Sequence, residues 1–272
     1  MTTSRTATGI AFDHARGGSG SPIVLLHAGV ADRRMWDPQW ARLSHVRPVM
    51  RLDLRGYGES TTKPEDGQPV DHVSDVLATL DEVGVRRCHL VGASYGAGVA
   101  VETALARPAV VESLLLCPPG GSLLAELTPD LESFIDAEDA ALARDDLGAA
   151  VEANVDWWVV GPTRERAAVA PSVIEAVRVM QRQAFEIEDQ WGPVDTKELD
   201  PPALRRFDEI TSRTLVLSGD HDLATTKDAV SRVIAGIDDA EEVRWSATAH
   251  LPSMEQPEEF LALLLEWTAR TD

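Results

Sequence analysis

Apolar residues occur along the chain in short runs of strand length, separated by segments with helical periodicity. The runs are rich in Val, Leu and Ile and occupy residues 22–28, 48–54, 87–93, 110–117, 213–219 and 241–247. Continuous apolar runs suit strands that are covered on both faces, so they predict a mainly parallel sheet. Helical patterns lie between them, over residues 70–83, 95–106, 225–236 and 257–270. This alternation predicts an α/β fold with right-handed crossovers and helices on both faces of a central sheet.

The alternation of strand and helix is interrupted between residues 121 and 202, where only helical periodicity is found. An insertion of this size between two sheet strands is expected to form a helical layer of its own, which would act as a lid where it lies over the strand ends. We therefore predict a core domain formed by residues 1–120 and 203–272, with an inserted helical lid formed by residues 121–202. The insertion contains 18 Asp and Glu against 6 Lys and Arg, which disfavours a strongly anionic substrate.

The overall composition limits the class of protein and its partners. The chain has 272 residues, of which 44% are hydrophobic and 26% charged, as in ordinary soluble globular proteins. Its formal charge of −20 repels polyanions, so nucleic acid and anionic membranes are not expected partners. The N-terminus lacks the apolar core of a secretory signal, and no stretch approaches the ~18 uninterrupted apolar residues of a membrane span. We expect a soluble, cytoplasmic protein that acts on a small molecule, and we leave a homodimer open.

The chain contains only two cysteines, Cys88 and Cys117. Cys88 begins one predicted strand and Cys117 ends the next, so in parallel strands their sulfurs would lie at opposite edges of the sheet. We predict two reduced thiols in the core. No Cys-x-x-Cys pair and no Cys/His cluster has the spacing of metal ligands, so no metal site is predicted.

The pentapeptide Gly-Ala-Ser-Tyr-Gly, residues 92–96, lies where a predicted strand gives way to a helix. It matches the pattern Gly-x-Ser-x-Gly, in which the serine occupies a strained turn and the glycines let the neighbouring backbones approach. The start of the helix directs free N–H groups to the same point, which favours developing negative charge. A tight turn without chemistry is the simpler reading of the pentapeptide alone. Its position between strand and helix favours Ser94 as a nucleophile.

A serine nucleophile needs a base to take its proton, and the base needs an acid to orient it. Two later segments supply these residue types in the chain order that such a turn requires. Residues 217–225 follow the penultimate predicted strand and include Asp220 and Asp222, and residues 246–257 follow the last one and include His250. Both segments are expected at the same sheet edge as Ser94, because the carboxyl ends of parallel strands meet there.

From about residue 8 to residue 270, the chain resembles the α/β-hydrolase family. The resemblance implies that Asp222 is the acid of a catalytic triad and that His250 is its general base, and it implies no cofactor. Asp220 is the rival acid, although we expect it to shape the turn through hydrogen bonds to the backbone. His221, between the two acids, is expected to be a surface or turn residue.

The segment 25–36, Leu-Leu-His-Ala-Gly-Val-Ala-Asp-Arg-Arg-Met-Trp, is similar to the oxyanion loop of that family. The resemblance implies that one backbone N–H of this loop and the N–H of Tyr95 bind the oxyanion of a tetrahedral intermediate. Gly29 is the loop donor by position. Ala28 and Val30 stand where the family usually has glycine and proline, so the donor stays open between Gly29 and Val30. His27 is expected to support the loop.

The segment 53–60, Asp-Leu-Arg-Gly-Tyr-Gly-Glu-Ser, is also similar to a family signature. Asp53 and Arg55 are expected in a polar network that fixes loops near the site. Relatives with this signature include epoxide hydrolases and haloalkane dehalogenases, whose nucleophile is an aspartate at the position of Ser94. The only tyrosines, Tyr57 and Tyr95, lie outside the predicted lid, whereas epoxide hydrolases use lid tyrosines as acids. Both reactions are therefore disfavoured.

A serine nucleophile with a histidine base indicates acyl transfer. We predict a cofactor-independent serine hydrolase that cleaves a small, fairly apolar carboxylic ester or lactone. The same triad could instead serve C–C bond hydrolysis, a lyase reaction or acyl transfer to another nucleophile. A ligand-binding receptor built on this fold is the alternative from a different class.

Aromatic residues of the predicted lid and of the oxyanion loop indicate an apolar substrate pocket. We expect Trp157 and Trp158 to contact the substrate, together with Val30 and Trp36 of the loop. Two arginines of the insertion, Arg178 and Arg182, lie one helical turn apart and could hold a carboxylate. A solvated ion pair between them and Glu175 or Glu186 is the simpler expectation.

Overall fold

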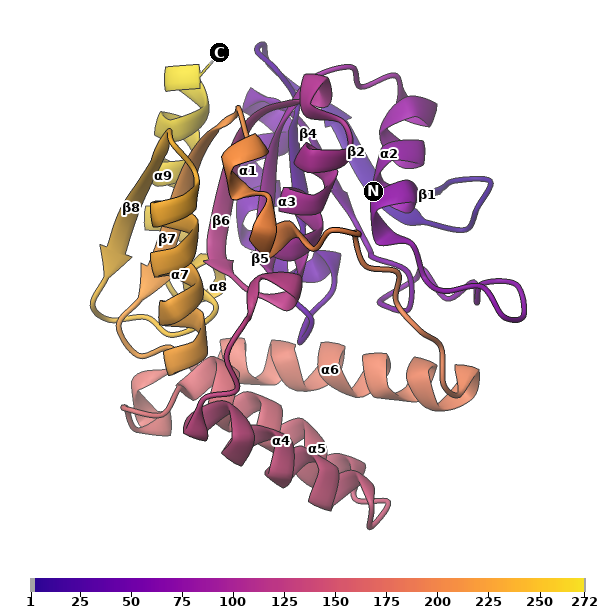
Figure 1. Ribbon diagram of the computed structural model, residues 1–272, viewed down its shortest axis with the longest axis vertical. Coiled ribbons are helices and arrows are strands. Elements are labelled where there is room, and N and C mark those ends of the chain that lie inside the picture. Colours follow the sequence, from indigo (N-terminus) through magenta and orange to yellow (C-terminus); the bar gives the residue numbers. More distant parts are fainter. Residues whose placement is uncertain (1–2, 272) are drawn as a thin grey trace.

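The computed structural model describes residues 3–271 (Figure 1), and their centre is a mostly parallel sheet of eight strands. In spatial order the strands run β1-β2-β4-β3-β5-β6-β7-β8. All strands from β3 onward pair in parallel, whereas β1 and β2 are antiparallel to their neighbours. The bounds are β1 (Ser4–Arg5), β2 (Ala11–Arg16), β3 (Ile23–Leu26), β4 (Pro48–Leu52), β5 (Cys88–Ser94), β6 (Val111–Pro119), β7 (Arg213–Gly219) and β8 (Ala240–Trp245). The predicted fold class is confirmed.

Helices cover both faces of the sheet and bury its apolar runs. On one face, side chains of α1 (Asp37–Val46) and α9 (Pro257–Thr271) form a hydrophobic cluster with residues of β3 and β5. On the other face, α2 (His72–Val83), α3 (Tyr95–Ala106) and α7 (Ala224–Gly236) contribute to a second cluster. All four residues of β3 are buried, because this strand lies inside the sheet with helices on both sides. This double burial explains why apolar runs predicted the inner strands.

The antiparallel edge of the sheet and helix α1 were not among the predicted elements. Strand β2 carries Asp13 and His14 in its centre, so it lacks the continuous apolar run of an inner strand. Asp13 is nevertheless buried, because Arg33 and Arg51 both form ion pairs with its carboxylate. The pairing of charges across separate segments thus permits a strand that the hydrophobic pattern does not reveal.

The insertion between β6 and β7 is helical. It contains α4 (Pro129–Leu142), α5 (Leu147–Asn154), a π-helical turn (Val155–Val160) and α6 (Pro171–Trp191). Helices α4, α5 and α6 lie together beyond one end of the strands, at the bottom of Figure 1. A short α8 (Pro252–Glu255) follows β8.

Both cysteines are buried free thiols. Burial raises the pKa of Cys88 to about 12 and raises the pKa of Cys117 as well. Between residues 3 and 271, no helix combines the length and the apolar character needed to cross a bilayer.

Candidate active site

Ser94 is the last residue of β5 and has a strained backbone, with φ of 51° and ψ of −113°. This region is rarely adopted by a residue with a side chain, and such strain is typical of functional turns. The flanking glycines are required sterically. A Cβ on Gly92 would lie 2.3 Å from the Gly96 oxygen, and a Cβ on Gly96 would lie 2.5 Å from the His27 oxygen. The turn therefore brings the start of α3 directly against β3 and lifts the Ser94 side chain from the sheet.

Three side chains from separate loops meet at this turn. His250 Nε2 lies 2.7 Å from Ser94 Oγ, and His250 Nδ1 lies 2.8 Å and 2.9 Å from the two carboxylate oxygens of Asp222. Asp222 and His250 are almost fully buried. With Nδ1–H donating to the carboxylate, Nε2 can accept the serine proton, which is the arrangement of a nucleophile, a base and an orienting acid.

The rival acid Asp220 lies elsewhere. Its carboxylate accepts a hydrogen bond from Arg244 of β8, and its backbone N–H donates to the Trp245 oxygen. His221 is bonded through Nδ1 to the Thr163 hydroxyl at 2.7 Å. Neither residue forms a hydrogen bond with His250. Of the two aspartates that the sequence offered as the acid, only Asp222 contacts the histidine.

The loop after β3 lies beside Tyr95. A Cβ on Gly29 would lie 3.5 Å from the Tyr95 Cβ, so Gly29 lies next to the residue that follows Ser94. His27 is fully buried and bridges the loop to its neighbour, because its Nδ1–H donates to the Ala28 oxygen at 2.8 Å and its Nε2 accepts from Leu54 N at 2.9 Å. Burial lowers the pKa of His27, which keeps this bridging ring neutral. The supporting contacts expected of His27 are present.

A glycine that the sequence analysis did not single out also borders the serine. A Cβ on Gly120, just after β6, would lie 2.8 Å from Ser94 Oγ. A side chain at position 120 would therefore clash with the Ser94 hydroxyl, which explains the glycine there.

The four residues predicted to contact substrate lie in different surroundings. Trp158 is in the π-helical turn with its ring centroid 4.5 Å from that of His250, and Trp157 is half-buried beside it. Val30 is buried next to Gly29. Trp36 is fully buried and packs on Phe260 of α9, with ring centroids 5.8 Å apart. The expectation for Trp36 is corrected: its ring fills the core beneath α9 and presents no surface to a ligand.

A buried ion pair joins the insertion to the His250 loop. The side chains of Arg164 and Glu255 are each only 6% exposed and form a salt bridge of 2.5 Å. Arg164 also donates to the oxygens of Val159 and Val160, both in the π-helical turn. Glu255 accepts from the backbone N–H of Ala249, next to His250, at 2.9 Å. This clamp fixes the turn that carries Trp158 relative to the histidine.

Asp53 and Arg55 belong to two separate ion pairs. Asp53 is fully buried and accepts from the guanidinium and the backbone N–H of Arg33. Arg55 donates to both carboxylate oxygens of Asp75 on α2. Both pairs tie loops near the serine to the core, as the sequence predicted, although the two residues do not pair with each other.

The two arginines of α6 differ in their partners. Arg178 forms ion pairs with Glu152 and Glu175, and hydrogen bonds from Arg178 are the main cause that lowers the pKa of Glu152 to about 2. Glu175 was the expected partner, whereas Glu152 of α5 is an addition that only the packing of helices reveals. No ion pair of Arg182 is found among residues 3–271.

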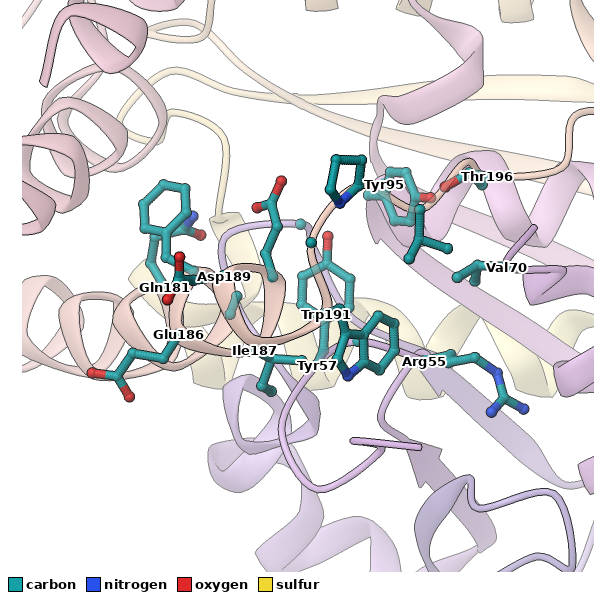
Figure 2. A pocket seen from close by; sticks show the side chains of 18 of the residues that line it. Arg55, Tyr57, Val70, Tyr95, Gln181, Glu186, Ile187, Asp189, Trp191 and Thr196 are labelled. Atoms are coloured by element: carbon teal, nitrogen blue, oxygen red, sulfur yellow. The ribbon is translucent and has the colours of Figure 1, made fainter. Parts of the chain in front are cut away.

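A cavity of about 870 Å³ opens beside Gly29 and Tyr95. Figure 2 shows Tyr57, Trp191 and Gln181 around it, with residues of α6 on one side and of the sheet domain on the other. Ser94 and His250 are not among the lining residues, whereas Tyr95, which follows Ser94 in the chain, is.

Three further lining residues were not assigned a role from the sequence. They are Tyr57, His72 and Gln181. Tyr57 and Gln181 are more than 100 residues apart in the chain. His72 packs edge-on against Tyr95, with ring centroids 5.3 Å apart. Tyr57 lies in the segment 53–60, whose resemblance to a family signature could have pointed to it, whereas no local motif surrounds His72 or Gln181.

A model of the α/β hydrolase family matches residues 23–263. The chain belongs to this family. It is therefore a hydrolase of this family. It has the family's fold and a serine at the turn from strand to helix.

Solved structures of the family cover nearly all of the chain. One described as Est816, an N-acyl homoserine lactone degrading enzyme, is 25% identical, covers 97% of this chain and 99% of its own, and has a TM-score of 0.73. A hydrolase from Pseudomonas aeruginosa is 26% identical, covers 97% of each chain and has a TM-score of 0.75.

Curated relatives match shorter stretches. The acetyltransferase component of an acetoin cleaving system from Pseudomonas putida is 37% identical over 39% of this chain, and the match spans 28% of that protein. The chain thus spans less than a third of this relative. A proline iminopeptidase from Heyndrickxia coagulans is 25% identical over 91% of this chain and 90% of its own.

Proposed function

We propose that this protein hydrolyses small, fairly apolar carboxylic esters or lactones through an acyl-enzyme on Ser94. The observation that carries the proposal is the 2.7 Å contact between Ser94 Oγ and His250 Nε2, with Asp222 on the other ring nitrogen. The names of the similar structures, which include a lactone-degrading enzyme, support the choice of substrate class.

In the first half-reaction, Ser94 Oγ attacks the carbonyl carbon while His250 Nε2 accepts the hydroxyl proton. The carbonyl π electrons move to oxygen, and the backbone N–H groups of Gly29 and Tyr95 bind the resulting oxyanion. The tetrahedral intermediate collapses, the C–O bond to the alcohol breaks, and the imidazolium of His250 donates its proton to the leaving oxygen. For a lactone, the leaving alcohol stays attached to the acyl group.

In the second half-reaction, water replaces serine as the nucleophile. His250 accepts a proton from water, the hydroxide oxygen bonds to the acyl carbon, and Ser94 leaves with the proton that the histidine returns. The carboxylate of Asp222 orients the ring and stabilises its charged form throughout. We assign Trp158 and Trp157 to the apolar wall of the acyl site, because Trp158 already contacts His250. We further propose that residues 121–202 act as the lid over this site.

The proposal is tested with a panel of p-nitrophenyl esters of increasing acyl length and several lactones. Ser94→Ala should lower turnover of every accepted substrate by about three orders of magnitude or more. A fluorophosphonate should label the wild-type protein on Ser94 and leave the variant unlabelled. Unchanged hydrolysis in the variant would overturn the assignment of the nucleophile. Labelling without hydrolysis of any ester or lactone would move the activity to C–C bond hydrolysis, a lyase reaction or acyl transfer, and tight ligand binding without labelling would indicate a receptor.

A further inference from the structure

The cavity beside Gly29 and Tyr95 is acidic and lacks a free cation. Five of its lining residues are acidic: Asp145, Glu186, Glu188, Asp189 and Asp195. None of them forms an ion pair with any residue between 3 and 271. The one basic lining residue is Arg55, whose guanidinium is bound to Asp75 and to two backbone oxygens and points away from the cavity in Figure 2.

The charge of Glu188, which lines the cavity, acts on two neighbouring titratable side chains, Glu138 and Tyr57. Burial raises the pKa of Glu138 on α4, and the charge of Glu188 on α6 adds to that rise. Both carboxylates also act on Tyr57, since burial first, and then the charges of Tyr95, Glu188 and Glu138, raise the pKa of its hydroxyl. Like charges that interact in this way destabilise each other. A positive charge placed at the Tyr57 hydroxyl would relieve this repulsion.

Buried polar groups in the wall of the cavity provide an independent indication of a ligand. Gln181 is 6% exposed, and its Oε1 finds no hydrogen-bond partner among the described residues. His72 is 5% exposed, and its Nδ1 likewise has no partner there. Burial lowers the pKa of His72 to about 4, so at neutral pH the ring is uncharged and keeps one nitrogen as an acceptor. A buried polar group without a partner is costly, and both residues could be satisfied by a donor in the cavity.

Carboxylates, an amide oxygen and a neutral imidazole all accept hydrogen bonds. We infer that this cavity binds a protonated amine carried by the substrate, while the ester or lactone carbonyl lies at Gly29 and Tyr95. A protonated amine offers three donors and the positive charge that the wall lacks. The described residues contain no group of His, Cys, Asp and Glu that could hold a metal ion, which favours an organic cation. The inference rests on the proposed function.

The test compares methyl 6-aminohexanoate with methyl heptanoate, which replaces the terminal ammonium by a methyl group of similar size. Hydrolysis is followed by proton release, and the measured quantity is the ratio of the two kcat/KM values. We expect the amine-ended ester to be preferred about five- to tenfold at low salt, as for a charge that gains roughly 1 kcal/mol or slightly more near a protein surface. The preference should fall at 0.5 M NaCl because salt screens exposed charges.

Two variants with the same chemical change form a matched pair. Glu188→Gln removes the carboxylate that acts on Tyr57 and should lower the ratio severalfold. Glu132→Gln makes the same change at an exposed position of α4 outside the lining of the cavity and should keep the preference. A ratio near one in the wild type, or equal falls in both variants, would overturn the inference.

A third ester, methyl 6-hydroxyhexanoate, separates charge from hydrogen bonding. Equal preference for the hydroxyl and the amine would show recognition of a neutral donor and would overturn the cationic site. The proposed function fails in a distinguishable way, because then none of the esters is cleaved and the fluorophosphonate does not label Ser94. In that case binding of 6-aminohexanoate methyl ester to the Ser94→Ala protein, measured by calorimetry against methyl heptanoate, still decides whether the cavity selects the amine.

Discussion

The indole of Trp158 lies 4.5 Å from the imidazole of His250, centroid to centroid, with the two rings inclined by 47°. The contact joins the π-helical turn of the insertion to the loop after β8. An indole face stabilises a neighbouring cation, so in the proposed mechanism Trp158 would stabilise the protonated ring of His250. Insertions of one residue into a helix, which produce π-helical turns, are frequent at functional sites.

Trp158→Leu is expected to lower kcat/KM for a short p-nitrophenyl ester about five- to thirtyfold, since a desolvated cation–π contact contributes roughly 1–2 kcal/mol. Steady-state kinetics of the variant check this. Trp158→Phe keeps an aromatic face and should recover part of the loss. Wild-type kinetics in the leucine variant would contradict a role for the indole.

Asp222→Asn is expected to lower kcat by about three to four orders of magnitude, because an amide cannot hold the imidazole in the correct tautomer. Asp220→Asn is the matched control from the same loop. It removes an exposed ion pair with Arg244, and such pairs contribute little, so activity should stay within about a factor of two. The reverse result would make Asp220 the acid.

Arg164→Met is expected to lower the free energy of unfolding by about 3–5 kcal/mol, because it leaves the buried Glu255 carboxylate without its partner. Urea denaturation measures this change. The double variant Arg164→Met/Glu255→Leu should recover much of the lost stability, since it removes both charges. Activity should stay low in both variants, because the clamp also holds Ala249 next to His250.

The stability of the fold is expected to decrease between pH 6.5 and about pH 4 through His72. Burial lowers the pKa of this ring to about 4 in the folded protein, whereas it stays near 6.5 in the unfolded chain. The unfolded state therefore binds more protons than the folded state in this range. The contribution of His72 to stability is fully present above pH 6.5 and is lost as the pH falls to about 4. Between pH 7 and pH 4.5, the free energy of unfolding of His72→Phe should fall by about 2–3 kcal/mol less than that of the wild type. Urea titrations at the two pH values measure this difference. Parallel curves for both proteins would argue against a neutral buried ring.

The hydrophobic pattern determined the fold class and most of the inner strands. The inner sheet strands are covered by helices on both faces, so their sequences are continuous apolar runs, and this signal is local. The edge strands β1 and β2 and helix α1 escaped prediction because their stability comes from ion pairs and packing between distant segments, such as Asp13 with Arg33. The role of Trp36 was misjudged for the same reason, since only its packing on Phe260 places it in the core.

The candidate triad was also predictable, because its signals are local. Gly92 and Gly96 are required by close backbone contacts at one turn, and the order of serine, acid and histidine follows from the order of strands in a parallel sheet. The tertiary structure decided which aspartate reaches His250 and which tryptophan lies against it. It also decided that Tyr57, His72 and Gln181 share one cavity with unpaired carboxylates. These relationships join segments far apart in the chain, and their distances depend on how the insertion packs, which no local pattern of residues encodes.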